Sequence, residues 1–174
     1  MKFNVVKALE ILERTPEILK IYLGSLSEDW TICNEGEETW SAFHIVGHLI
    51  HGEKTDWAER LQLIMSDGEI KTFTPFDRFA QFDESKDKKL VQLLNEFDEL
   101  RAQNIALLKS FNIQESDFER RAIHPELGEI TLRNLLATWV THDLGHISQI
   151  ARVMAKQYKE EVGPWTKYIS ILNK

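Results

Sequence analysis

The spacing of hydrophobic residues along the chain predicts four long amphipathic helical segments. Apolar side chains recur every three or four residues, which places them on one face of a helix and leaves the charged residues on the other. The predicted segments are Phe3–Leu23, Ser41–Met65, Leu90–Ser110 and Thr131–Tyr158. No stretch alternates convincingly between apolar and polar positions, as a half-buried strand would. We therefore predict an all-α chain folded as a four-helix bundle.

Residues with special backbone preferences refine the ends of these segments. Thr15-Pro16 predicts a break or kink inside the first segment, because proline disrupts a helix except in its first turn. Ser41 and Thr131 are suitable N-caps for the second and fourth segments. Gly163 ends the last long pattern, and Pro164 opens a short C-terminal helix.

Two long connections join the predicted helices. The first, Ser66–Lys89, contains four phenylalanines, and loops of this length in compact domains are usually functional or cover something. We expect these side chains to hold the connection over a bundle end, a pocket mouth or a subunit interface; they are Phe73, Phe76, Phe79 and Phe82. The second, Phe111–Ile130, is rich in turn residues and has room for a short extended piece near Ile123 or Ile130.

Composition narrows the class of protein. The 174 residues are enough for one domain, residues 1–174, and 43% hydrophobic with 28% charged residues is the balance of a soluble globular chain. The net charge of −7 argues against a nucleic-acid partner, which would need clustered Lys and Arg. The N-terminus runs directly into an amphipathic pattern, so we expect neither a signal peptide nor a membrane span. The single cysteine, Cys33, fits a reducing cytoplasm and is expected to be an inert thiol rather than a nucleophile.

Two histidines interrupt the apolar stripe of the fourth segment. His142 and His146 lie four residues apart on one helix face, at positions where the pattern calls for leucines. The stripe on either side of them consists of Leu135, Trp139, Ile150 and Val153. A buried imidazole needs partners for both ring nitrogens, and two adjacent imidazoles are well suited to sharing a cation. This helix is therefore predicted to carry half or more of a metal site.

The second segment offers a third nitrogen ligand. His44, His48 and His51 lie on one line of this helix, although a solvated polar face would give the same pattern. Three imidazoles with an open position are typical of catalytic zinc and also suit nickel, cobalt, copper or iron. Spacing alone does not select the third ligand. The sequence has no nucleophile elbow, phosphate-binding loop, dinucleotide fingerprint or His-Glu-x-x-His motif, and no Glu-x-x-His pairs of the di-iron type.

Several short motifs together resemble those of the DinB-like superfamily of helical-bundle proteins. They are Trp40-Ser41, Gly47-His48-Leu49, Asp143-Leu144-Gly145-His146 with Gln149, and the stretch from Tyr158 through Gly163-Pro164-Trp165. Further residues resemble those of one subgroup of this family. They are Trp57, Arg60, Pro75 to Phe79, His124-Pro125 and Leu135 to Trp139. The resemblance covers nearly the whole chain. It implies an up-down-type four-helix bundle, commonly a homodimer, with a divalent metal, often nickel or zinc.

The resemblance also assigns the ligands. Carried over by position, His48, His142 and His146 would hold the metal. The family includes enzymes that transfer low-molecular-weight thiols to electrophiles and a thiol-dependent isomerase, which implies a metal-dependent transferase acting on a small molecule. Two alternatives stay open: a metal-dependent hydrolase that uses an activated water, and a non-enzymatic helical module that a metal only staples.

Five further residues are weighed for supporting roles. His51 and Glu53 are candidates for acid–base or supporting roles, with a plain surface position as the alternative, especially for Glu53. Gln149 is placed to orient a ligand or a bound water. Asp143 points about 100° away from the ligand face, so it is predicted to lie at the surface or to pair between helices. His124 is expected either near the pocket mouth or in a surface turn.

Overall fold

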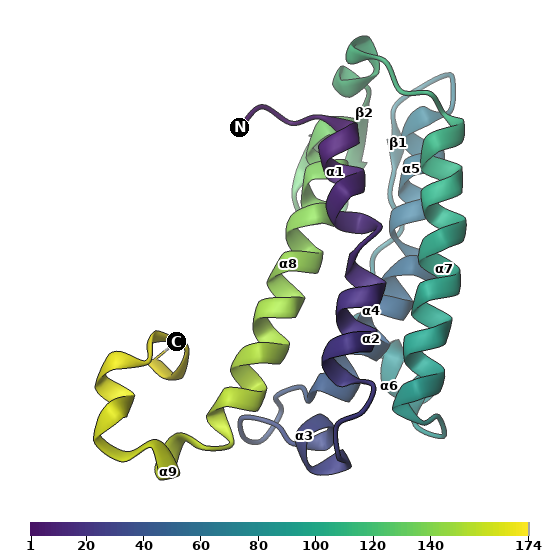
Figure 1. The fold of residues 1–174 in the computed structure, drawn as a ribbon. Coiled ribbons are helices and arrows are strands. Elements are labelled where there is room, and N and C mark those ends of the chain that lie inside the picture. Colours follow the sequence, from purple (N-terminus) through teal and green to yellow (C-terminus); the bar gives the residue numbers. More distant parts are fainter. Residues whose placement is uncertain (174) are drawn as a thin grey trace.

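The computed structural model describes residues 1–173, which fold into four helical rods lying side by side (Figure 1). The rods are α1 (Val5–Leu12) followed by α2 (Thr15–Leu23), α4 (Ala42–Thr55) followed by α5 (Trp57–Met65), α7 (Leu90–Ser110) and α8 (Leu132–Lys156). The four-helix bundle predicted from the hydrophobic pattern is confirmed. The predicted break at Thr15-Pro16 is present as the junction between α1 and α2.

Smaller elements fill the connections and the C-terminal segment. They are α3 (Glu28–Ile32), β1 (Lys71–Thr72), α6 (Ala80–Ser85), η1 (Glu115–Glu119), β2 (Arg121–His124), β3 (Gly128–Thr131), α9 (Lys159–Val162), η2 (Gly163–Tyr168) and η3 (Ser170–Asn173). The strands form a small sheet in the order β1-β2-β3, in which β1 pairs parallel to β2 and β2 antiparallel to β3. Ala122 lies opposite Ile130 in the antiparallel pair. The extended pieces predicted near Ile123 and Ile130 are thus both real, and they pair with each other.

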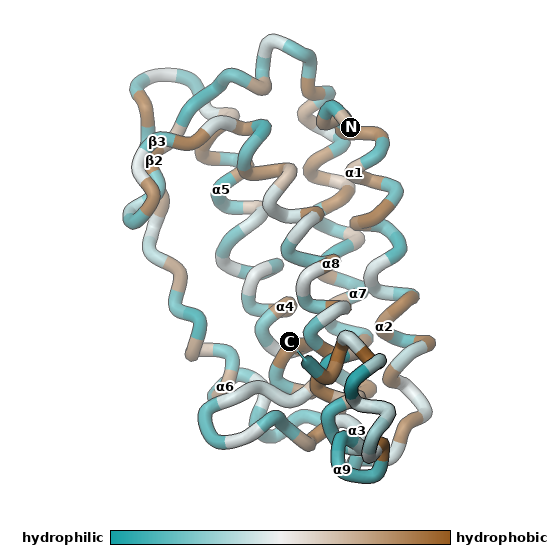
Figure 2. Tube along the Cα trace, turned by 90° about the vertical axis from the view of Figure 1, so that its left-hand side faces the viewer, coloured by the Kyte–Doolittle hydropathy of each residue, from teal (hydrophilic) through white to brown (hydrophobic). Residues whose placement is uncertain are grey.

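The connection between α5 and α7 runs along the length of the bundle (Figures 1 and 2). It leaves the end that carries the small sheet and reaches the opposite end at α6, close to where α4 begins (Figure 1). As a result α7 starts at the same end as α4, and the second and third rods run parallel. The up-down order that the resemblance implies is therefore not followed between these two rods, because the long connection returns the chain to the end where α4 begins. A long crossover of this kind is what parallel neighbours in a bundle require. It also lays the connection over the α4–α5 rod.

Two of the predicted helix starts are confirmed by their caps. The Ser41 hydroxyl accepts a hydrogen bond from the backbone N–H of His44 at 3.3 Å. The Thr131 hydroxyl accepts one from the backbone N–H of Asn134 at 3.2 Å. In both cases the side chain satisfies a backbone donor that the first turn of a helix leaves without a partner.

The second predicted segment differs from the structure. The second segment was expected to be one continuous helix, but it is interrupted at Asp56, whose backbone angles are φ −122° and ψ −75°. The apolar pattern does not reveal the break, because Ile50, Trp57 and Leu61 keep near-helical spacing across it. The interruption falls among the residues that line the cavity described below, Gly52, Asp56 and Trp57.

Two clusters of buried apolar side chains form the core, one toward each end of the bundle. Trp57, Trp139 and Leu132 belong to the cluster beside the small sheet, while Ile45, Phe97 and Val153 belong to the other. The C-terminal segment turns away from the rods (Figure 1) and is built mostly of 3-10 turns. The short helix predicted to open at Pro164 is present as the 3-10 helix η2, with the proline in its first turn. Among residues 1–173, no helix combines the length and hydropathy needed to cross a bilayer.

Candidate metal centre

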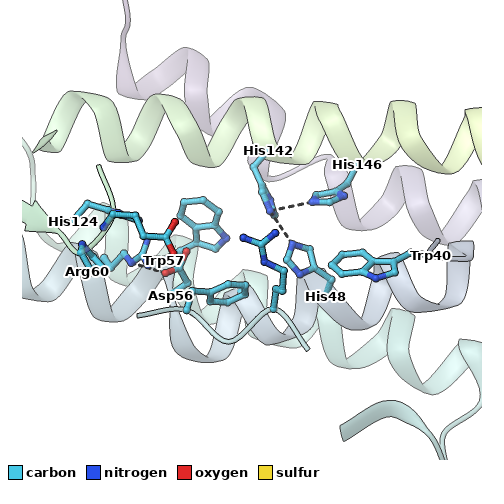
Figure 3. Close-up of a pocket in the computed structure, with 13 residues that line it drawn as sticks. Trp40, His48, Asp56, Trp57, Arg60, His124, His142 and His146 are labelled. Atoms are coloured by element: carbon cyan, nitrogen blue, oxygen red, sulfur yellow. Dashed lines mark hydrogen bonds and ion pairs between the residues drawn. The ribbon is translucent and has the colours of Figure 1, made fainter. Parts of the chain in front are cut away.

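Three imidazoles from two rods converge on one point in the interior of the bundle (Figure 3). His48 extends from α4, and His142 and His146 extend from successive turns of α8. Nε2 of His142 lies 3.2 Å from Nε2 of His48 and 3.1 Å from Nε2 of His146. The two histidines that interrupt the apolar stripe therefore do face inward, and a third joins them from the neighbouring rod.

Burial keeps these imidazoles neutral. Desolvation lowers the pKa of His48 to about 3 and that of His142 to about 2, and the neighbouring positive charges act in the same direction. Desolvation also lowers the pKa of His146. At neutral pH each ring can therefore offer a nitrogen lone pair, which is the form in which histidine binds metals.

Gln149 fixes the tautomer of one of the rings. Its side-chain oxygen lies 2.8 Å from Nδ1 of His146. Because an amide oxygen can only accept, His146 must carry its hydrogen on Nδ1, and its Nε2 then presents a lone pair to the cluster. This contact is the one that the predicted orienting role of Gln149 requires.

Hydrogen bonding alone does not satisfy the three converging nitrogens. If His142 carries a hydrogen on Nε2, that hydrogen can point to His48 or to His146 but not to both. A cation between the rings would accept all three lone pairs at once, and three neutral imidazoles are a donor set suited to zinc or nickel. Among residues 1–173, no fourth His, Cys, Asp or Glu joins the group. The donor set therefore fits a divalent ion with an open coordination position.

The other two histidines of α4 have partners elsewhere. Nδ1 of His44 lies 3.1 Å from the Ser41 hydroxyl, within the cap of the helix. Nδ1 of His51 lies 3.0 Å from a carboxylate oxygen of Glu84 on α6. Of the three candidates on one line of the helix, His48 is the one that meets the pair on α8. The alternative of a surface position for His51 is wrong, since only 5% of it is exposed.

Gly47, which precedes His48, allows α6 to pack closely against α4. A Cβ atom at this position would lie 2.6 Å from side-chain oxygens of both Gln81 and Ser85. Real Cβ atoms do not approach their neighbours so closely, so any larger residue would force the side chains of Gln81 and Ser85 to move. The glycine of the Gly47-His48-Leu49 motif therefore has a packing role beside the histidine cluster.

The cluster opens into a cavity of about 390 Å³. The cavity is bounded by the α4–α5 rod, α8, the long connection and the turn between β2 and β3. Besides the three histidines, its lining residues are Trp40, Gly52, Asp56, Trp57, Arg60, Phe76, Arg78, His124, Pro125 and Glu126. His124 lines the cavity, which confirms the first of its two predicted positions, near the pocket mouth. The ring of Phe76 lies 5.6 Å from that of His48, so the connection does cover the mouth of a pocket, one of the roles predicted for it.

Asp56 is a cavity residue that the sequence reading missed. It is only 7% exposed, and burial raises its pKa to about 6 even though Arg60 lowers it. Nε of Arg60 lies 2.5 Å from Oδ1 of Asp56, so the two side chains form an ion pair. No periodicity singles out this residue, because the apolar spacing of the helix continues across Asp56.

Glu53 lies neither at the surface nor in the cavity, so its expected surface position is wrong. It is fully enclosed and accepts three side-chain hydrogen bonds. Nη2 of Arg101 donates at 2.8 Å, Nδ2 of Asn104 at 2.9 Å and Nε1 of Trp139 at 3.2 Å. Arg101 and Asn104 belong to α7, for which the sequence predicted only a helix of the bundle. Both are buried.

The Arg101 guanidinium contacts all four rods. From α7 its Nη1 donates to the backbone oxygen of Leu12 at the end of α1 at 2.9 Å, and to Oδ2 of Asp143 on α8 at 2.6 Å. Its Nη2 donates to Oδ1 of Asp143 at 2.9 Å as well as to Glu53 on α4. Asp143 is fully buried, which confirms the predicted pairing between helices and rules out the surface alternative. The network ties together the rods that carry His48 and His142.

Comparison with known proteins agrees with this arrangement. The family model described as the DinB superfamily matches residues 11–150. No curated protein sequence matches the chain. Among solved structures, one similar protein is YfiT from Bacillus subtilis, described as a probable metal-dependent hydrolase with an unusual four-helix bundle topology. The two share 25% identity with a TM-score of 0.69, over 84% of this chain and 85% of that one. The chain belongs to the DinB superfamily.

Proposed function

We propose that this chain is a divalent-metal-dependent enzyme that hydrolyses a small molecule in the cavity, with His48, His142 and His146 as the metal ligands. The observation that carries the proposal is the convergence of three neutral imidazoles, whose Nε2 atoms are separated by 3.1 and 3.2 Å along the cluster, at one side of an open cavity. The description of YfiT as a probable metal-dependent hydrolase supports it. Nickel and zinc are the ions we propose.

The chemistry separates into what an ion would supply and what the chain supplies. A divalent ion held by His48, His142 and His146 would lower the pKa of water bound to it and so supply a nucleophile near neutral pH. The chain holds the ligand rings neutral and oriented, and Trp40, Trp57 and Phe76 give the cavity apolar walls. Asp56 lines the same cavity and would act as the proton acceptor. Hydrolysis of an ester or amide needs such a group to take a proton from the attacking water and pass it to the leaving group.

The Asp56 role predicts a pH effect. A proton acceptor must be ionised, and the pKa of Asp56 is raised to about 6 by burial. We expect the activity of the metal-loaded protein to fall as pH drops below about 6, and Asp56→Asn to lower kcat about 100-fold and remove this acidic limb. The pH profile of kcat, measured at constant metal content, checks both. An unchanged profile in Asp56→Asn would exclude the role.

Transfer of a low-molecular-weight thiol is the second candidate. The volume of the cavity leaves room for a small thiol beside a small electrophile. The thiol would have to come from outside the chain, because Cys33 does not line the cavity and burial raises its pKa. A free thiol at Cys33 also fits the cytoplasmic location that we propose.

One experiment separates these functions. Purified untagged protein is analysed for metal content and then assayed with ester and amide panels, and with generic electrophiles in the presence of small thiols. Turnover of an ester or amide without thiol supports hydrolysis, whereas consumption of an electrophile only with thiol supports transfer. About one divalent ion per chain is expected in either case. A chain without metal would refute both, and a metal whose shell is closed by a fourth protein ligand would leave the non-enzymatic module.

We also propose that the protein is a homodimer. Two aromatic side chains of the C-terminal segment are mostly in solvent, Trp165 at 70% and Tyr168 at 75% exposure, and such groups are enriched at interfaces. A double variant, Trp165→Ser with Tyr168→Ser, is expected to shift the protein toward monomer in light scattering. Leu127→Ser removes an equally exposed apolar side chain elsewhere and serves as the control. A wild-type monomer at micromolar concentration would contradict the proposal.

A further inference from the structure

An exposed arginine lines the cavity next to the histidine cluster. Arg78, on the long connection, lines the cavity together with His48 and His142. Its positive charge is the smallest of the causes that lower the pKa of His48, after burial and the charges of His146 and His51. Within residues 1–173 it forms no ion pair, whereas Arg60, the other arginine of the cavity, is paired with Asp56.

The connection that carries Arg78 packs against α4 through the residue two positions before it. The preceding aromatic ring, Phe76, packs at 5.6 Å from the ring of His48 and at 5.1 Å from that of His51. The side-chain oxygen of Asp77 accepts a hydrogen bond from the backbone N–H of Phe79 at 2.9 Å. The guanidinium therefore extends from a short turn next to the ring of Phe76, which packs beside His48.

The charges of the cavity favour an anion at this position. Arg60 and Asp56 offset each other, and Glu126, the remaining carboxylate of the lining, lies on the opposite turn without an ion pair to Arg78. An unpaired guanidinium beside a divalent ion is repelled by it, and an anionic ligand between the two relieves that repulsion. A guanidinium also matches the planar geometry of a carboxylate, to which it can donate two hydrogen bonds.

We infer that the substrate of the proposed metal enzyme carries a carboxylate and that Arg78 binds it while the reacting group lies at the histidine cluster. The inference rests on the proposed function and names the class of small molecule that the site takes. It makes Arg78 a specificity residue rather than a catalytic one.

The test compares two probes that differ only in charge. Succinic acid monohydroxamate carries a metal-binding group and a carboxylate, and its primary amide analogue has the same size without the charge. Binding of each to zinc-loaded protein is measured by calorimetry for wild type, Arg78→Met, Arg78→Lys and Arg121→Met. Arg121 is an exposed arginine outside the cavity, paired with Glu129, so its loss changes the net charge equally.

Wild type and Arg121→Met are expected to bind the charged probe about tenfold or more tightly than the amide, which is the ratio expected for a hydrogen-bonded charge pair. Arg78→Met should bring this ratio to about one without changing affinity for the amide, and Arg78→Lys should keep part of it. Equal affinities in wild type, or a ratio that survives Arg78→Met, would overturn the inference and leave the metal site intact. Zinc that fails to load at all would overturn the proposed function itself.

Discussion

Replacing His142 with alanine is expected to abolish metal binding and activity together. His142 is the central ring of the cluster, and its Nε2 lies within 3.2 Å of the Nε2 atoms of both His48 and His146. Loss of a residue that merely supports a ligand typically costs about 10- to 100-fold in metal affinity, so loss of a ligand should cost more than about 100-fold. Metal content after dialysis and competition with a chelator measure the effect.

His44→Gln is the matched control for this variant. It removes an imidazole from α4 that lies outside the cluster, where His44 contacts Ser41 in the helix cap. It should therefore keep about one ion per chain and most of the activity, whereas His142→Ala keeps neither. The change at His142 removes no hydrogen bond to other parts of the fold apart from the ring contacts, so circular dichroism should show the same helical content. Equal metal content in His142→Ala and wild type would refute the assignment of the ligands.

The histidine cluster shows what the sequence can and cannot supply. Histidines that replace apolar residues in a helical stripe can be recognised in the sequence, so His142 and His146 could be identified from periodicity alone. The third ring could not, because His44, His48 and His51 share one line of a helix, and the rotation of α4 against α8 decides which of them meets the pair. Only the resemblance to a family selected His48, and the distances agree with it.

The same reasoning, applied to charged residues, would have found the network on the other side of α8. Glu53, Arg101 and Asp143 each fall on the apolar spacing of their own helix, between residues such as Phe97 and Ile105 for Arg101. Opposite charges on the core faces of three helices indicate a buried ionic contact, since an unpaired charge there would be too costly. Asp56 is different. The helix breaks at this residue, but the apolar pattern continues through the break and gives no sign of it.

Arg101→Met is expected to destabilise the protein by about 3–5 kcal/mol, the range for breaking a buried ion pair by removing one partner. Burial lowers the pKa of Arg101, but the carboxylates of Glu53 and Asp143 outweigh that effect and raise it above its usual value, so the group is a cation in the core. Without it, both carboxylates remain buried and face each other. Urea unfolding followed by circular dichroism measures the loss.

Lys109→Met provides the comparison on the same helix. Lys109 also pairs with a carboxylate, that of Glu13 at 2.7 Å, but both partners are about half exposed, and such pairs contribute about 0–1 kcal/mol. A triple variant, Arg101→Met with Glu53→Gln and Asp143→Asn, leaves no buried charge and should recover part of the stability lost in Arg101→Met. A loss below about 1 kcal/mol for Arg101→Met would mean that packing alone holds the four rods together. The full loss with partial recovery would instead show that the two buried carboxylates depend on the charge of Arg101, which links α4, the helix of His48, to α8, the helix of His142.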